Sequence, residues 1–159
     1  MIDRTAGFAK SMTNGGRTMV GGLRLEDLSV GQSAERVHEV SEADIGAFAA
    51  VSGDANPLHM DEAYAATTQF KGRIAHGMLG ASYLSALLGN DLPGPGSVYL
   101  SQTLRFRRPI RIGDVVTARV RVTSIDQDKA RVTLETQCLV GDKAAMDGEA
   151  VVMVERRGA

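Results

Sequence analysis

Apolar and polar residues alternate along the second half of the chain. Of four β-like stretches, three place valine, leucine, alanine or cysteine at about every second position, and a period of two puts these side chains on one face of a strand. Short turns at residues 126–129 and 141–143 join successive stretches as hairpins. The pattern therefore predicts an antiparallel sheet with one buried face. The stretches are about residues 97–108, 114–126, 129–140 and 144–156.

Helical spacing replaces this alternation in the first half. After a candidate strand at residues 33–40, Ser41-Glu42-Ala43-Asp44 resembles a capping box and predicts a helix to about Val51. A short helix is expected over residues 61–68. Residues 77–88 form a longer run that is apolar on nearly every side, so we expect this helix to be buried.

These elements predict an α+β fold in which an antiparallel sheet wraps around one long central helix. We expect a single domain over residues 23–159. Residues 1–22 are rich in Gly, Ser, Thr, Asn and Met without periodicity, which predicts a flexible arm or leader. A sheet covered by one helix leaves apolar surface and a free edge, so a homodimer is expected.

Composition excludes several classes of protein. A net charge of -1 argues against general nucleic-acid binding. No apolar run reaches the roughly 18–20 residues of a membrane span. Cys138 is the single cysteine, so an internal disulfide is impossible, and the sequence shows no Cys/His pattern of a metal site. We expect a cytoplasmic protein that binds neither metal nor membrane.

Candidate acid/base chemistry lies between residues 52 and 59. Asp54 and His59 flank Asn56-Pro57, and the proline fixes a bend that lets both side chains face one cavity. A carboxylate and an imidazole in one pocket can activate a water molecule. The alternative is structural: Asp54 caps a turn and His59 is a hydrogen-bonded core residue.

A second candidate lies at the start of the long helix. Backbone N–H groups there are unpaired, and Gly77 lets a ligand oxygen approach closely, as at an oxyanion hole. Ser85, two turns further on, is placed to present a hydroxyl to the same cavity. The alternatives are that Gly77 only caps the helix, that His76 bonds locally, and that Ser85 bonds the preceding turn.

Basic residues gather around Pro109. They offer either phosphate ligands for an anionic substrate or a solvated strand edge. The residues are Arg105, Arg107, Arg108 and Arg111, with Lys71 and Arg73 earlier in the chain.

Three motifs together resemble the MaoC-like hydratases, and in particular the short single-domain (R)-specific enoyl-CoA hydratases. They are Asp54-X-Asn56-Pro57-X-His59, the run of residues 73–78, and the run of residues 105–114. The resemblance covers about residues 23–156.

This resemblance implies a hot-dog fold, a homodimer and a trans-2-enoyl-CoA substrate, with no cofactor. It assigns catalysis to Asp54 and His59, and substrate binding to the Gly77 N–H and Ser85. Branched or dicarboxylic enoyl-CoA, or an acyl-carrier-protein thioester, are alternative substrates. A thioesterase or a non-catalytic acyl-CoA-binding module are alternative functions, since fold alone does not decide function.

Overall fold

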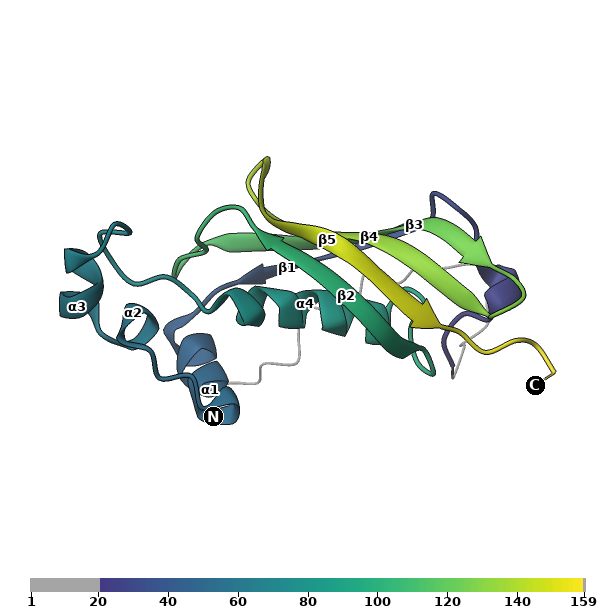
Figure 1. The fold of residues 1–159 in the computed structure, drawn as a ribbon, viewed down its shortest axis with the longest axis horizontal. Helices are drawn as coiled ribbons and strands as arrows, with labels where there is room; N and C mark the ends of the chain where they lie inside the picture. The colour runs from purple at the N-terminus through teal and green to yellow at the C-terminus, as the bar shows by residue number, and fades with distance from the viewer. Residues whose placement is uncertain (1–20, 159) are drawn as a thin grey trace, which may run out of the picture.

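A five-stranded antiparallel sheet and one long helix form the body of the protein (Figure 1). The structure, a computed structural model, describes residues 21–158, so the predicted arm lies outside it except for Gly21 and Gly22. The strand order is β1-β3-β4-β5-β2. The strands are β1 (Ser33–Glu39), β2 (Val98–Phe106), β3 (Val115–Asp126), β4 (Arg131–Val140) and β5 (Lys143–Met153). The helices are η1 (Leu25–Asp27), α1 (Glu42–Ser52), α2 (Pro57–Met60), α3 (Glu62–Thr67) and α4 (Gly77–Asn90).

The predicted strands are all present, with ends that differ from the prediction by up to three residues. The second strand ends at Phe106, because the backbone N–H groups of Arg107 and Arg108 both donate to the Ala145 carbonyl instead of continuing the ladder. The last strand ends at Met153 rather than at residue 156. Every neighbouring pair in the sheet is antiparallel, as predicted.

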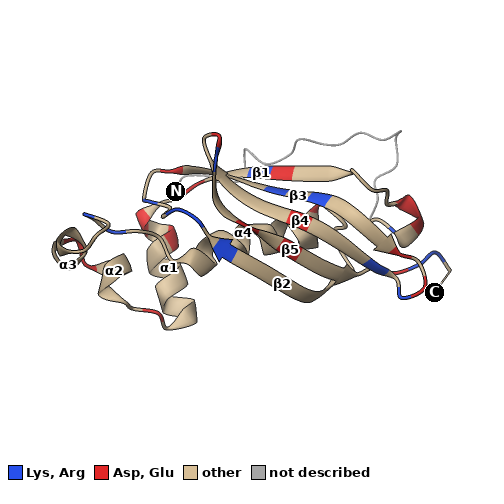
Figure 2. Cartoon of the chain, turned by 45° about the horizontal axis from the view of Figure 1, so that its top comes forward, with Lys and Arg blue, Asp and Glu red and all other residues tan. Residues whose placement is uncertain are grey.

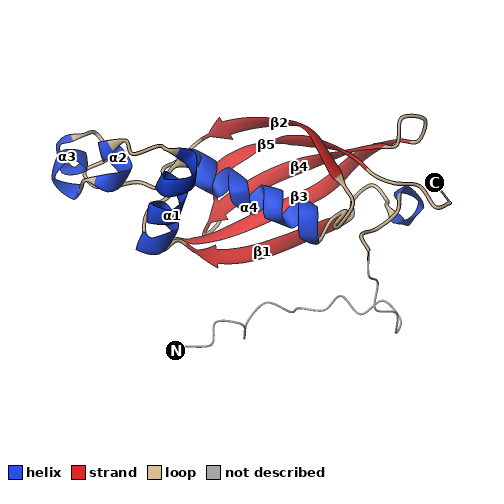
Figure 3. Cartoon of the chain, turned by 90° about the horizontal axis from the view of Figure 1, so that it is seen from below, coloured by secondary structure: helices blue, strands red, loops and turns tan. Residues whose placement is uncertain are grey.

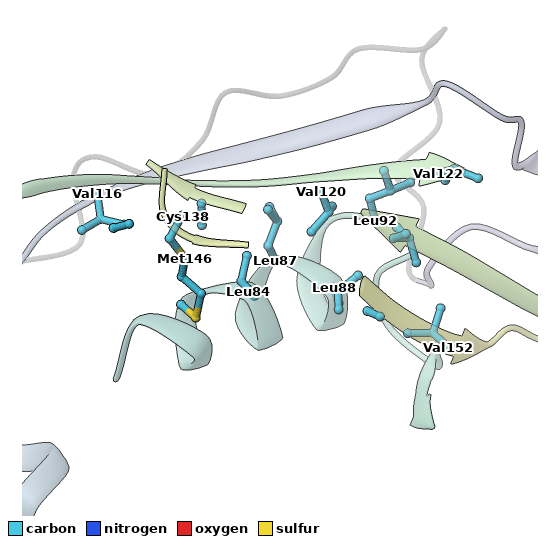
Figure 4. Packing of buried hydrophobic residues seen from close by; sticks show 14 of the residues in the cluster. Leu84, Leu87, Leu88, Leu92, Val116, Val120, Val122, Cys138, Met146 and Val152 are labelled. Atoms are coloured by element: carbon cyan, nitrogen blue, oxygen red, sulfur yellow. The ribbon is translucent and has the colours of Figure 1, made fainter. Parts of the chain in front are cut away.

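The central helix α4 crosses one face of the sheet (Figure 3). Leu84, Leu87 and Leu88 are fully buried and point at the strands (Figure 4). They belong to one buried cluster with Val120 of β3 and with buried residues of β4 and β5. Each such leucine contributes roughly 1.5–3 kcal/mol through burial. The predicted arrangement of a sheet around a buried helix is confirmed.

The short helices α1, α2 and α3 stand beyond one end of the sheet, beside the start of α4 (Figure 1). Helix α1 has the predicted capping box, in which Ser41 and Asp44 exchange hydrogen bonds, and it ends at Gly53 with φ 77°. Helix α2 was not predicted. Pro57 occupies its first turn, where no N–H is needed, and Asn56 caps it through the Leu58 N–H. Residues 57–60, where the sequence predicts a bend, therefore form one helical turn.

Charges of both signs mix on the outer face of the sheet (Figure 2). Arg119 pairs with Glu35, and Arg121 pairs with Glu135 at 2.7 Å. This face is a solvated ion-pair surface rather than a basic patch. Within residues 21–158, no helix is both long and apolar enough to cross a membrane.

Candidate active site

A pocket of about 440 Å³ lies at the N-terminal end of α4. Asp54 and His59 line it from the α1–α2 segment, and His76 and Gly77 line it from the start of α4. Phe106 closes another side from the end of β2. The structure thus brings together both halves of the predicted site.

Asp54 lies on the turn between α1 and α2 and is exposed. Its Oδ1 accepts the Asn56 backbone N–H at 3.2 Å, the kind of turn bond that the structural alternative foresaw. Among the described residues Oδ2 has no hydrogen-bond donor. One carboxylate oxygen therefore holds the turn, and the other is available to a bound molecule.

His59 is 9% exposed and is oriented by one ring nitrogen. Its Nδ1 lies 2.8 Å from the Ile74 carbonyl. A carbonyl only accepts, so Nδ1 carries the hydrogen and the neutral ring has an unprotonated Nε2. The structural and the catalytic interpretation are thus compatible, since His59 is hydrogen-bonded and still keeps a proton acceptor.

His76 does not bond locally, as one alternative supposed. Its Nε2 lies 2.9 Å from the backbone carbonyl oxygen of Asp54, 22 residues earlier in the chain. Its ring lies against that of His59, with centroids 4.1 Å apart. One ligand-type atom from each of Asp54, His59 and His76 falls within a common 4.8 Å, so the three side chains form one compact group.

Gly77 is the first residue of α4, and its N–H finds no acceptor among the described residues. A Cβ at this position would lie 2.6 Å from Cε1 of Phe106, closer than atoms tolerate. The glycine therefore allows the aromatic ring to lie against the helix start. An unpaired N–H at this end of a helix attracts negative charge.

Ser85 lies outside this pocket. It is exposed on α4, at helical spacing from Met78 and Ser82, which are also exposed. The structure of one chain thus does not bring its hydroxyl to Asp54 and His59.

Some of the basic residues around Pro109 are bound within the chain, and others are free to contact a ligand. Arg73 binds Glu42 of α1 at 2.6 Å and also reaches Glu62 of α3, while Arg111 donates to the Phe70 carbonyl at 2.6 Å. The hydrogen bond from Arg73 lowers the pKa of the Glu42 carboxyl. Arg108 lines the pocket and has no ion pair among residues 21–158. It is the arginine best placed to meet an anionic ligand there.

Sequence reasoning missed three parts of the site. These are the Phe106 ring on Gly77, the carbonyl of Ile74 that orients His59, and the Arg73 clamp between α1 and α3. Backbone carbonyls carry no sequence signal. The positions of Phe106 and Arg73 within two of the motifs were the only available hints.

The pocket holds a carboxylate and an imidazole at the start of a helix that is wrapped by an antiparallel sheet, as the sequence motifs predicted. The MaoC like domain matches residues 28–143, and the chain belongs to the MaoC-like dehydratase family. The (R)-specific enoyl-CoA hydratase of Rhodospirillum rubrum is 53% identical over 84% of this chain and 92% of that protein. A 3-hydroxybutyryl-CoA dehydratase of Methylorubrum extorquens is 47% identical over 85% of this chain and 86% of its own length. The unliganded R-hydratase of Pseudomonas aeruginosa matches with a TM-score of 0.81 and 47% identity, over 86% of this chain and 88% of that one.

Proposed function

We propose that this protein is a hydro-lyase that adds water to trans-2-enoyl-CoA and forms (R)-3-hydroxyacyl-CoA, a reaction that is reversible. One observation supports this proposal most directly. A single pocket is lined by Asp54, by His59, whose Nε2 is left without a hydrogen, and by Gly77, whose N–H is unpaired. The names of the similar proteins from Rhodospirillum rubrum and Methylorubrum extorquens support the same chemistry.

In the proposed mechanism Asp54 and His59 hold one water molecule between them. The carboxylate takes a proton as the water oxygen attacks C3 of the enoyl thioester, and the His59 Nε2 accepts a hydrogen bond that orients the water. Negative charge develops on the thioester oxygen, where the Gly77 N–H donates to it. The proton taken up by Asp54 is then delivered to C2, which completes the addition of water and restores the carboxylate.

The positive charge of Arg108 suits the phosphates of coenzyme A at the pocket mouth. Arg107 already binds Asp147 at 2.8 Å, so it is less available for this role. We therefore assign the anionic contact to Arg108.

A second copy of the chain completes the proposed enzyme. The edge strand β2 exposes Val98, Tyr99 and Leu100, which are 47%, 38% and 43% accessible. A long apolar edge of this kind invites pairing with another strand. We propose a homodimer joined through β2. In this dimer the partner covers the exposed face of α4 that carries Ser85, and the Ser85 hydroxyl reaches the acyl chain of the substrate.

The single buried Cys138 and the absence of a disulfide suit a cytoplasmic enzyme, which we also propose. No step of the mechanism needs a cofactor or a metal ion.

The test is to mix the purified protein with crotonyl-CoA and follow both the enoyl absorbance and free thiol. The proposal predicts loss of the enoyl absorbance without thiol release, at a rate unchanged by EDTA. Thiol release would indicate a thioesterase, and thermal stabilisation without turnover would indicate a binding module. A panel of straight, branched, dicarboxylic and carrier-protein enoyl thioesters then ranks the substrates.

A further inference from the structure

We propose that His76 is the positioning residue of this site: its Nε2–H holds the Asp54 turn in place and its ring holds His59. The inference rests on the proposed function and adds a third residue to it. His76 is only 2% exposed, and the proposed mechanism does not use its side chain.

The bond from His76 is the long-range anchor of the Asp54 turn. Within the described residues, the other hydrogen bonds of residues 53–56 reach no further than four positions along the chain. The His76 bond spans 22 positions and joins the turn to the start of α4. Without it, the exposed turn that carries the catalytic carboxylate is tied to the domain only through its two ends.

The chemistry of this bond sets the tautomer of His76. Because the Asp54 carbonyl only accepts, Nε2 carries the hydrogen. The other nitrogen, Nδ1, is buried and has no hydrogen-bond partner among residues 21–158. A buried polar atom without a partner costs stability, so an ordinary structural role would favour an apolar side chain here. A histidine at this position supplies the Nε2–H donor to the Asp54 carbonyl, which an apolar side chain could not supply.

The ring of His76 reaches the other two parts of the site. Its centroid lies 4.1 Å from that of His59 and 4.9 Å from that of Phe48 of α1. Gly77 follows it directly in the chain. One side chain thus sets the positions of the carboxylate turn and the imidazole relative to the helix end that carries the Gly77 N–H.

Three substitutions separate the donor from the bulk of the ring. Glutamine places its side-chain N–H near the position of Nε2, asparagine places it near Nδ1, and leucine keeps an apolar group. We expect H76L and H76N to lower kcat for crotonyl-CoA about tenfold or more with KM changed little, since misplacing a reacting group has this cost. H76Q should recover most of kcat.

The contrary results are equally specific. A folded H76L with wild-type kcat, a loss confined to KM, or an H76Q no better than H76N would overturn the proposal. If H76L does not fold, as judged by circular dichroism and thermal melting, the comparison of H76Q with H76N decides.

Nuclear magnetic resonance gives a readout that does not depend on turnover. Long-range ¹H–¹⁵N spectra of the wild-type protein at pH 8 should show the Nε2–H tautomer of His76. The carbonyl ¹³C shift of Asp54 should move in H76N and return in H76Q. An Nδ1–H tautomer would overturn the proposal even if the protein hydrates enoyl thioesters. Conversely, failure of hydration with these spectra as expected would refute the proposed function and leave the hydrogen bond intact.

Discussion

The ring of Phe106 lies against Gly77 so closely that a Cβ on the glycine would come within 2.6 Å of Cε1. The end of strand β2 thereby packs on the start of α4, and both line the pocket. Any side chain at residue 77 must displace the ring or tilt the first turn of the helix. The N–H that we assign to the thioester oxygen belongs to this same residue.

Replacing Gly77 with alanine should therefore lower kcat at least about tenfold, because the donor loses its alignment with the thioester oxygen. Steady-state hydration of crotonyl-CoA measures the effect. The matched control is Gly89→Ala on the same helix, where an added Cβ meets nothing within 4 Å. That variant should keep its activity and melt no lower than wild type. Equal kcat values for the two variants would argue against a role for the Gly77 N–H.

The clamp between Arg73 and Glu42 should make stability depend on pH. Hydrogen bonding to Arg73 lowers the folded-state pKa of Glu42 below the ordinary value of 4.5. Its contribution is then complete above about pH 4.5 and is lost as the pH falls through the folded-state pKa. Glu42→Gln should lower Tm at pH 7, and the difference from wild type should shrink in acid, as the pH falls below the folded-state pKa of Glu42.

Glu149→Gln is the control for this prediction. Glu149 is exposed on β5 and forms no ion pair with the described part of the chain. It lies opposite Glu135 on β4, so Glu149→Gln should not lower Tm at pH 7 or in acid. A Glu42→Gln deficit that persists unchanged in acid would show that the clamp acts through packing rather than through charge.

Cys138 should resist thiol reagents while the protein is folded. It is fully buried against α4, where its thiol donates to the Gly80 carbonyl, and burial raises its pKa to about 12. The thiolate that reacts with such reagents is therefore scarce at pH 8. Titration with Ellman's reagent should give no reaction in buffer and one thiol per chain in guanidinium chloride. Rapid stoichiometric reaction of the folded protein would contradict this packing.

The proposed dimer predicts a solution mass of twice 16.9 kDa by light scattering. Leu100→Lys places a charge on the exposed β2 edge and should give a monomer of lower activity, since edge lysines block strand pairing. Val30→Lys changes a 66% exposed turn residue and should leave the dimer intact. A wild-type monomer with full activity would remove both the interface and the role that we give Ser85.

The periodic spacing of apolar residues along the chain predicts much of the fold. Alternation along residues 114–140 and the apolar run of residues 77–88 each record a local requirement, namely which face of one element is buried. Asp54 and His59 were recognisable because they lie five positions apart on one segment. The bond from His76 to the Asp54 carbonyl was not predictable, because it joins segments 22 residues apart that only tertiary packing brings together.

The helix of Pro57–Met60 shows the same limit at short range. Pro57 predicts a bend, yet its missing N–H is no loss in the first turn of a helix. The Asn56 cap and the packing of His59 decide between a bend and a helical turn at Pro57. The contact of Phe106 with Gly77 likewise depends on where β2 ends, which the alternation left two residues too late.

In the proposed mechanism Asp54 activates water for addition to one face of an enoyl thioester. The most direct measurement compares Asp54→Asn with wild type on crotonyl-CoA, with chiral analysis of the product and Asp142→Asn, an exposed turn residue, as control. We predict (R)-3-hydroxybutyryl-CoA from wild type and Asp142→Asn, and a loss of about 10²-fold or more in Asp54→Asn. A folded Asp54→Asn protein that hydrates at the wild-type rate, or a wild-type product of (S) configuration, would contradict the account.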